Sequence, residues 1–248
     1  MKALILGATG GCGSQALTRL LERGVAVTAI VRDEARLPAA ARGHALLTVV
    51  SAPTGHLELD AQTMLEHVRG CDAIVSALGH HMSFKGIWGR QHRMLCVDSL
   101  RQLCAAARTL APPAPIRLVV VSTEGVDEPG GADPVRGRGE RFVLWLLKKL
   151  LPPHADNMAA AAFLHREGTG SPHIEFCAVR PSDLVDAEPS KYTLHATLQN
   201  GLFNAGTTAR ANVGAFMADL VTEEATWKAW RGKYPHILDV PEERKKAK

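Results

Sequence analysis

Met1-Lys-Ala-Leu-Ile-Leu-Gly-Ala-Thr-Gly-Gly-Cys-Gly-Ser14 is the stretch that decides the fold of this chain. Residues 3–6 form a short apolar run without polar alternation, which is typical of a parallel strand covered on both faces. Gly7, Gly10 and Gly13 then follow at three-residue spacing, and an apolar stripe at helical spacing continues to residue 21. The pattern predicts a strand, a glycine turn and a helix, in that order.

A strand–glycine turn–helix unit is typical of a phosphate-binding site. The first glycine allows a tight turn, the second lets the backbone approach a pyrophosphate, and the third lets the helix pack close to the strand. The N–H groups of the first helical turn and the helix dipole then face the anion. We therefore predict a dinucleotide site, with a merely structural glycine turn as the alternative. The residues predicted to contact the cofactor here are Gly7, Thr9, Gly10, Gly11, Cys12 and Gly13.

The second predicted strand, Val25–Val31, indicates which dinucleotide binds. An acidic residue at the end of this strand suits the ribose 2′-hydroxyl of NAD, whereas an arginine suits the 2′-phosphate of NADP. Arg32 follows the strand directly, and Arg36 is a second candidate ligand for that phosphate. The prediction is NADP (NADPH). Asp33 keeps NAD open, and both arginines have an alternative interpretation as ordinary solvated side chains.

Strands and helices continue to alternate along the chain. Apolar runs predict further strands at 45–50, 71–77, 116–121 and 173–179, and periodic segments predict helices at 35–41, 60–69, 91–110, 155–166 and 211–221. This order predicts an α/β fold, a Rossmann-like doubly wound parallel sheet with helices on both faces. We expect a single domain over 1–248, with a nucleotide-binding core at about 1–181, a small C-terminal substrate-facing region at about 182–240 and a basic tail at 241–248.

Several motifs together resemble one family. Gly7-Ala-Thr-Gly-Gly-Cys-Gly13 followed by Val31-Arg32-Asp33 is similar to the NmrA-like, NAD(P)H-binding branch of the atypical short-chain dehydrogenase/reductases, which includes flavin and biliverdin-IXβ reductases. Further matching segments are 72–79, 119–123, 178–181 and 207–213. The resemblance extends from residue 1 to about 222. It implies cofactor contacts at Ala77, Leu78, Gly79, Ser122 and Pro181, with Pro181 behind the nicotinamide.

Composition narrows the class of protein. No segment reaches the ~20 apolar residues of a membrane span, and the start enters a strand without a signal peptide, so we expect a cytoplasmic protein. The net charge of +4 equals the charge of the tail residues Arg244, Lys245, Lys246 and Lys248, so the rest of the chain is balanced. No basic face with interleaved aromatic residues accompanies the tail, and we do not expect nucleic-acid binding.

The five cysteines include no C-x-x-C pair, so we expect reduced thiols and neither a disulfide framework nor a metal site. Cys12 lies at the predicted helix N-terminus, where the dipole favours a thiolate. The plainer interpretation is a small residue that fits a crowded turn.

Two segments are candidates for the acceptor side of the site. The loop 79–89 combines glycines, aromatic residues and the adjacent His80 and His81, and it leaves the carboxyl end of a strand. Either histidine can serve in proton transfer, or both can be surface features. The segment 140–151 is nearly apolar all round and follows a predicted mobile loop at 129–139. We expect it to pack against a partner subunit, a protein partner, the substrate or a lid, with core burial as the alternative.

The chemistry is constrained by a missing dyad. Tyrosine-dependent members of the superfamily use Tyr-x-x-x-Lys, but neither Tyr192 nor Tyr234 is followed by lysine at the fourth place. The flavin-reductase-like branch also lacks the dyad and relies on positioning and exclusion of water. The candidate catalytic residues are Thr123, Ser122, Asp183 and His80. The first three have a structural alternative, as caps of a strand end or a turn.

Three functions therefore remain in order of preference. The first is an NADPH-dependent oxidoreductase that transfers hydride to a flat conjugated small molecule of flavin or quinone type. The second is a non-catalytic NADP-binding redox sensor of NmrA type. The third is an isomerase or epimerase, which ranks last because such enzymes generally retain the tyrosine.

Overall fold

The computed structural model describes residues 1–80, 92–131, 133–134, 136–201 and 203–240. The predicted loop beyond His80, including His81, the first residue of the predicted helix 91–110 and the basic tail all lie outside the described residues.

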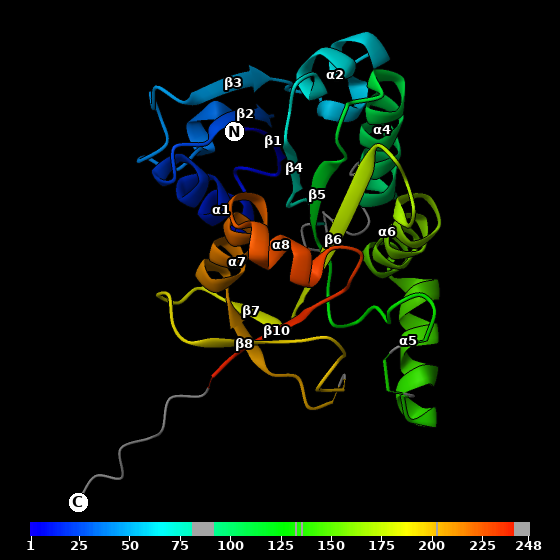
Figure 1. Cartoon of the computed structure of the whole chain (residues 1–248). Helices are drawn as coiled ribbons and strands as arrows, with labels where there is room; N and C mark the ends of the chain where they lie inside the picture. The colour runs from blue at the N-terminus through cyan, green and yellow to red at the C-terminus, as the bar shows by residue number, and fades with distance from the viewer. Residues whose placement is uncertain (81–91, 132, 135, 202, 241–248) are drawn as a thin grey trace, which may run out of the picture.

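One sheet of eight strands organises the molecule (Figure 1). In spatial order it contains β3 (Leu47–Ser51), β2 (Ala26–Val31), β1 (Lys2–Leu6), β4 (Ala73–Ser76), β5 (Ile116–Val121), β6 (Ile174–Pro181), β10 (His236–Asp239) and β8 (Tyr192–His195). Neighbouring strands pair in parallel from β3 to β10, and only β8 runs antiparallel to its neighbour. The Rossmann-like, mostly parallel sheet is thus confirmed. A separate two-stranded sheet joins β7 (Asp183–Val185) to β9 (Thr207–Ala209).

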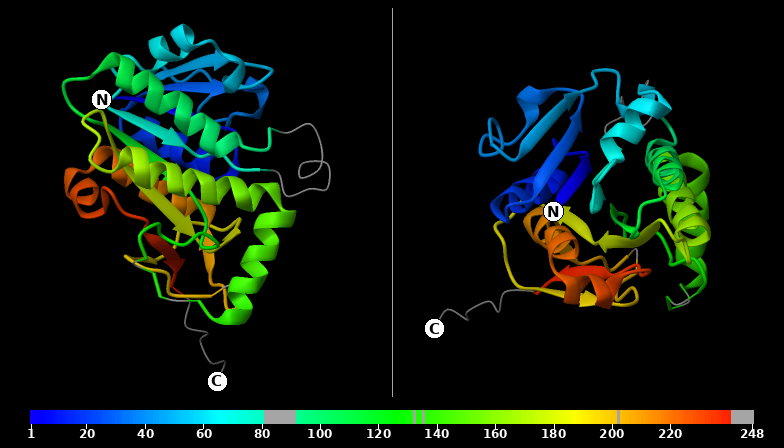
Figure 2. Two further views of the ribbon diagram at one scale, coloured as in Figure 1. Left: turned by 90° about the vertical axis from the view of Figure 1, so that its right-hand side faces the viewer. Right: turned by 45° about the horizontal axis from the view of Figure 1, so that its top comes forward.

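Helices cover both faces of the sheet, as Figure 2 shows. One core contains side chains from α1 (Gly11–Glu22), α7 (Arg210–Thr222) and α8 (Glu224–Trp230). The opposite core contains side chains from α2 (Ala61–Val68), α4 (Leu95–Leu110) and α6 (Pro152–Gly168). The remaining helices of the described residues are α5 (Arg138–Leu150) and the short 3-10 helices Glu34–Arg36 and His56–Glu58.

Burial on both faces explains the apolar run that opens the chain. Along β1, Ala3 and Ile5 belong to one core and Leu4 and Leu6 to the other, and all four are fully buried. A fully buried leucine or isoleucine contributes about 1.5–3 kcal/mol relative to exposure, so no position of this strand favours a polar residue. The central strand is therefore specified by hydrophobic burial alone.

The C-terminal part of the chain contributes to the main sheet. β10 pairs with β6 and carries β8 beyond it, while α7 packs against α1. Neither α8 nor β10 was predicted from the sequence. The four-residue strand β10 is too short for its hydrophobic pattern to distinguish it from a loop.

Three local predictions need correction. Residues 35–41 do not form a helix beyond the turn Glu34–Arg36, because Pro38 removes an N–H donor that a longer helix would need. The loop predicted as mobile at 129–139 is held to β6 at Asp133, which forms a buried ion pair with Arg180. Core burial of 140–151 is wrong, because no residue of α5 is buried.

Candidate cofactor and active site

A cavity of about 560 Å³ opens at the carboxyl ends of the first strands. In a parallel sheet this edge, where the strand order reverses around β1, is where ligands bind. The predicted site residues that line the cavity are Gly7, Thr9, Gly10, Gly11, Cys12, Arg32, Arg36, Ala77, Leu78, Gly79 and His80. The fold therefore brings together eleven predicted residues from three separate segments, 7–12, 32–36 and 77–80. Most of them are predicted cofactor contacts.

The glycine turn is shaped by close backbone contacts. Gly7 has φ +82°, and a methyl group there would lie 2.7 Å from the carbonyl carbon of Ala77. A methyl group on Gly13 would lie 2.8 Å from the carbonyl carbon of Gly7, so this residue lies behind the cavity wall and allows α1 to approach β1. The N-cap is Gly10, with neither a capping side chain nor an acidic residue in the first turn. The first-turn N–H groups are thus left for an external anion.

Basic side chains line the end of the cavity beside β2 and β3. Arg32 and Arg36 both border it. Asp33, the residue that kept NAD open, accepts a hydrogen bond from the N–H of Ala35 at 3.0 Å and so caps the turn Glu34–Arg36. Its carboxylate is used inside the protein, whereas Arg32 and Arg36 both line the cavity.

His56 also lines this end, and the sequence analysis did not identify it. Its Nε2 lies 2.6 Å from the hydroxyl oxygen of Ser99. Burial lowers the pKa of His56 to about 4, helped by the nearby charge of Arg32. The imidazole is therefore neutral near pH 7. It lines the cavity as an uncharged, hydrogen-bonded side chain.

Arg210 is the second residue that was not identified as a site residue, although it lies inside one of the family motifs. It lines the cavity, and its side chain lies so close to Gly11 that a Cβ there would overlap it. α7 can bring it there because Gly214 allows close contact with α1: a methyl group on Gly214 would lie 2.7 Å from the N of Ala16. Arg210 pairs with the exposed Asp186 at 2.9 Å. A third guanidinium thus lies beside the glycine turn.

His80 follows β4 and is held by a buried carboxylate. Its Nε2 lies 2.7 Å from Oδ2 of Asp156, and both side chains are almost fully buried. Asp156 also accepts the N–H groups of Cys96 and Val97, at 2.7 and 3.0 Å, and so caps α4. Burial alone would raise the pKa of Asp156, but the hydrogen bonds from His80 and the two amides outweigh it and hold the pKa below its usual value.

The ligand atoms of His80, Cys96 and Asp156 lie within 4.8 Å of one another. This arrangement is a hydrogen-bonded cap rather than a set of free metal ligands. Both carboxylate oxygens of Asp156 already accept N–H donors, and burial raises the pKa of the Cys96 thiol well above its usual value.

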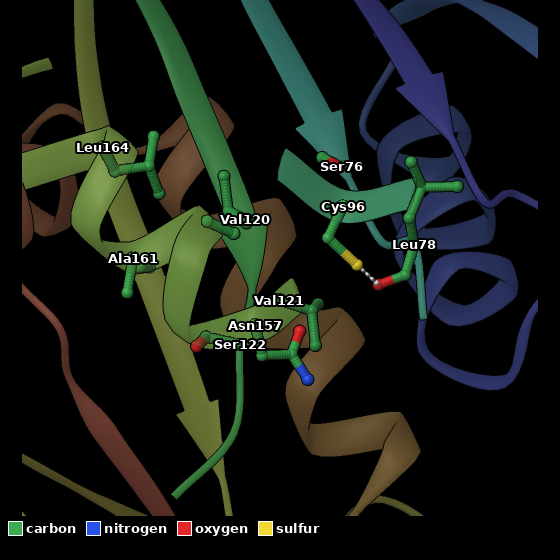
Figure 3. A pocket seen from close by; sticks show the side chains of 11 residues that line it. Ser76, Leu78, Cys96, Val120, Val121, Ser122, Asn157, Ala161 and Leu164 are labelled. Carbon is green, nitrogen blue, oxygen red and sulfur yellow. Dashed lines mark hydrogen bonds between the residues drawn. The ribbon is translucent and has the colours of Figure 1, made fainter. Parts of the chain in front are cut away.

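The other predicted catalytic residues lie outside the lining of the large cavity. Ser122 lines a neighbouring small cavity of about 10 Å³, shown in Figure 3, where Asn157 of α6 also lies. Leu78 and Val121 border both cavities, so the two adjoin. The Thr123 hydroxyl accepts the Gly125 N–H at 3.2 Å, which is the capping role given as its alternative.

Pro181 and Asp183 lie at the other side of this edge. Pro181 is buried at the end of β6, and Asp183 is exposed at the start of β7, with its backbone N–H donated to Gly206. His154 lies beside the segment that follows β5: its ring is 3.7 Å from where a Gly125 Cβ would stand. Within the described part of the chain the buried Nε2 of His154 has no hydrogen-bond partner, and burial lowers its pKa.

Cys12 lines the cavity but is 8% exposed. Burial raises the pKa of its thiol to about 11, although the charge of Arg210 works in the opposite direction. The environment thus favours the plain interpretation of a small residue in a crowded turn over that of a reactive thiolate.

The fold and the cavity define a Rossmann-type dinucleotide-binding protein. The model of the NAD(P)H-binding family matches residues 7–224, and the chain belongs to this family. No curated protein matches the chain.

Solved structures of similar fold cover nearly the whole chain. The oxidoreductase ylbE from Lactococcus lactis is 17% identical with a TM-score of 0.67, and the match covers 97% of this chain and 91% of that one. A provisionally assigned NADH-flavin reductase from Streptococcus pneumoniae is 18% identical with a TM-score of 0.65, covering 97% and 100%. A wide-type short-chain dehydrogenase/reductase from Veillonella parvula, solved in complex with NADP, is 17% identical with a TM-score of 0.67, covering 96% and 94%. At these identities the likeness establishes the fold.

Proposed function

We propose that this protein is an NADPH-dependent reductase that transfers hydride to a flat conjugated small molecule, a flavin or a quinone. The observation that carries the proposal is that one cavity joins two unlike sets of residues. Its lining combines the glycine turn and three arginines with the apolar side chains of Leu78, Val121 and Leu184. The first suits a phosphate-bearing coenzyme, and the second suits the stacking of planar rings with little water.

The residues present fit the coenzyme. The cradle at Gly7 and Gly13 leaves no room for side chains, and the first turn of α1 offers uncapped N–H groups to a pyrophosphate. Arg210 adds positive charge beside that turn. Arg32 and Arg36 are the proposed ligands of the adenosine 2′-phosphate, and the engagement of Asp33 in a cap supports NADP over NAD.

On the acceptor side, the proposed work of the protein is positioning and proton transfer. Bound NADPH supplies the hydride, and a quinone that takes up one hydride needs one proton to become a hydroquinone. His80 is the proposed proton donor, because it lines the cavity and Asp156 fixes its ring. Ser122, Thr123 and Asp183 stay weaker candidates, since each lies outside the cavity lining. A cytoplasmic location, where the five free thiols would stay reduced, is part of the proposal.

The test is NADPH oxidation by the purified protein with a panel of acceptors containing flavins, quinones and biliverdin. We expect turnover with at least one planar acceptor, and His80→Gln should lower its rate at least about tenfold while NADPH affinity stays the same. Tight NADPH binding without turnover on any acceptor would contradict the proposal.

That second outcome would support the alternative, a non-catalytic NADP-binding redox sensor of NmrA type. One observation favours it: α5 presents an exposed apolar surface that a protein partner could cover. A sensor should bind NADP and NADPH with different affinities, and its coenzyme binding should change when the protein partner is added. A reductase needs NADPH and the acceptor but no protein partner.

A further inference from the structure

The outward side of α5 carries large apolar groups in solvent. Phe142, Trp145 and Leu150 are 62%, 55% and 52% exposed, and Leu146 is 39% exposed. The Phe142 and Trp145 rings stack with their centroids 5.9 Å apart. Half of the eight large exposed apolar side chains in the described residues therefore belong to one helix of 13 residues. Such a concentration marks an interaction site.

The opposite side of α5 holds it to the molecule. Val143, Leu144 and Leu147 are half-buried. The first turn is fixed by Arg136, which pairs with Glu140 and Asp127 and donates to the carbonyl of Glu124 at 2.6 Å. Figure 2 shows the helix at the edge of the molecule, joined to α6 at one end. The exposed side is thus presented on a fixed element.

A second exposed apolar side chain lies in a loop that reaches the start of this helix. A methyl group on Gly201 would lie 3.1 Å from Oε2 of Glu140, so the loop that contains Gly201 reaches the first turn of α5. Phe203, two residues further on, is 75% exposed, the highest value among the large apolar side chains of the described chain.

Cationic side chains are interleaved with these apolar groups. Arg138, Arg141, Lys148 and Lys149 are all exposed, and they precede and follow the aromatic pair along the helix. The one acidic residue of α5 is Glu140, which is half-buried and paired with Arg136. The exposed side of the helix is therefore both apolar and positively charged.

This combination selects among the surfaces that could cover the helix. A two-fold contact with a second copy would bring the four cations of one copy against the same four of the other. A membrane surface with anionic headgroups has the complementary charge, and Trp, Phe and Leu side chains of an amphipathic helix bury at the headgroup boundary. We propose that α5 docks this protein on membranes that contain anionic lipids.

The test is sedimentation of the full-length protein with vesicles at about 0.1 M salt, with phosphatidylcholine alone or mixed with phosphatidylglycerol. We expect binding to the mixed vesicles that falls at high salt, and little binding to phosphatidylcholine alone. The double variant Phe142→Ser/Trp145→Ser and the double variant Lys148→Gln/Lys149→Gln should each weaken binding at least about tenfold. Leu46→Ser is the matched control, because Leu46 is also exposed but lies before β3, and it should leave binding unchanged.

Retained NADPH binding by every variant shows that it is folded and keeps this test independent of the proposed reductase activity. Three results would overturn the proposal: no binding to the mixed vesicles, equal binding to uncharged vesicles, or binding that survives the Phe142→Ser/Trp145→Ser change. A dimer in solution that dissociates in the same variant would also overturn it, in favour of a second copy as the occupant.

Discussion

The glycine turn and the segment around Arg180 both lie at the carboxyl ends of the parallel strands. Different kinds of interaction stabilise them. The turn between β1 and α1 is built from backbone atoms within seven residues, Gly7 to Gly13, which pack against the backbone of Ala77 and Leu78 and the side chain of Arg210. Arg180, at the end of β6, is fully buried and donates to the carboxylate of Asp133, 47 residues away, at 2.5 and 3.1 Å. The glycine turn depends on the close fit of backbone atoms. The segment around Arg180 depends on buried charge pairs between residues that are distant in sequence.

A second buried polar cluster lies close to Arg180 in sequence, and it too joins distant segments of the chain. The Ser182 hydroxyl contacts Glu124 and lies 2.9 Å from Nε2 of His236, while Nδ1 of His236 accepts the N–H of Gln199. The three side chains come from separate segments and are buried. Buried polar groups of this kind are stable only when each finds its partners. The region around Arg180 should therefore respond more strongly to the loss of a single charge than the glycine turn.

The largest expected effect is from Asp133→Ala. This change leaves the Arg180 guanidinium buried without its carboxylate, and we expect a loss of about 3–5 kcal/mol in the free energy of unfolding. Asp127→Ala is the matched control, because Asp127 pairs with Arg136 but its side chain is 55% exposed, and its loss should cost less than about 1 kcal/mol. Urea unfolding measures both, and equal losses would remove the contrast between the two regions.

Gly13→Ala tests the nucleotide side. The added methyl group would lie against backbone atoms of Gly7 that cannot rotate away, so we expect a loss of about 2–3 kcal/mol and weaker NADPH binding. Gly139→Ala is the control, since a Cβ there meets no atom within 4 Å, and in a helix it should raise stability by about 0.5–1 kcal/mol. Unchanged stability and cofactor affinity in Gly13→Ala would show that the turn relaxes.

The same contrast separates what the sequence predicts from what it does not. The glycine turn is predictable because its spacing, strand and helix are all within one short stretch. Arg32 directly follows the neighbouring strand, and Arg36 comes four residues later. Arg210 lies in the family motif at 207–213, but the sequence does not mark it as a site residue, because its position depends on the contact of Gly214 with α1.

Long-range contacts also explain the other omissions. In the sequence, Asp156 is indistinguishable from an ordinary polar residue of a helix. It can cap α4 and bond to His80 only because α4 packs on α6. Asp133 lies in a stretch rich in glycine and proline, which indicates a free loop, and only the fold brings Arg180 to it. Local motifs are readable from sequence, whereas partners of buried charges need the structure.

Arg32→Ala sharpens the assignment of the nucleotide end. Losing a charged hydrogen-bond donor to the 2′-phosphate costs about 1.5–3 kcal/mol, so NADPH affinity should fall about 10- to 100-fold. NADH has no 2′-phosphate, and its affinity should change much less. Titration of the variant and the wild type with both coenzymes gives the comparison, and equal losses would contradict the proposed NADP preference.

The pH dependence of the stability of Asp156→Asn tests whether the charge of the buried Asp156 carboxylate stabilises the fold. The hydrogen bonds from His80, Val97 and Cys96 hold the pKa of Asp156 below its usual value despite burial, so the ionised form stabilises the fold. This contribution is fully present above about pH 4 and is lost as the pH falls through the lowered pKa. We expect the variant to lose about 1 kcal/mol near pH 6 and the difference from wild type to narrow toward about pH 3. A difference that is constant with pH would assign the effect to shape rather than charge.

The smallest effect concerns Cys12, in the first turn of α1. Burial raises the pKa of its thiol to about 11, so little thiolate exists near pH 7 and modification by a thiol reagent should be slow. Because Cys12 lines the cavity, NADPH should slow it further, whereas Cys104, which is half-buried on α4, should react at the same rate with and without coenzyme. Mass spectrometry of the labelled protein separates the two sites. Equal rates at Cys12 in both states would mean that the coenzyme does not rest on the first turn of α1, and the functional assignment of the glycine turn would fail with it.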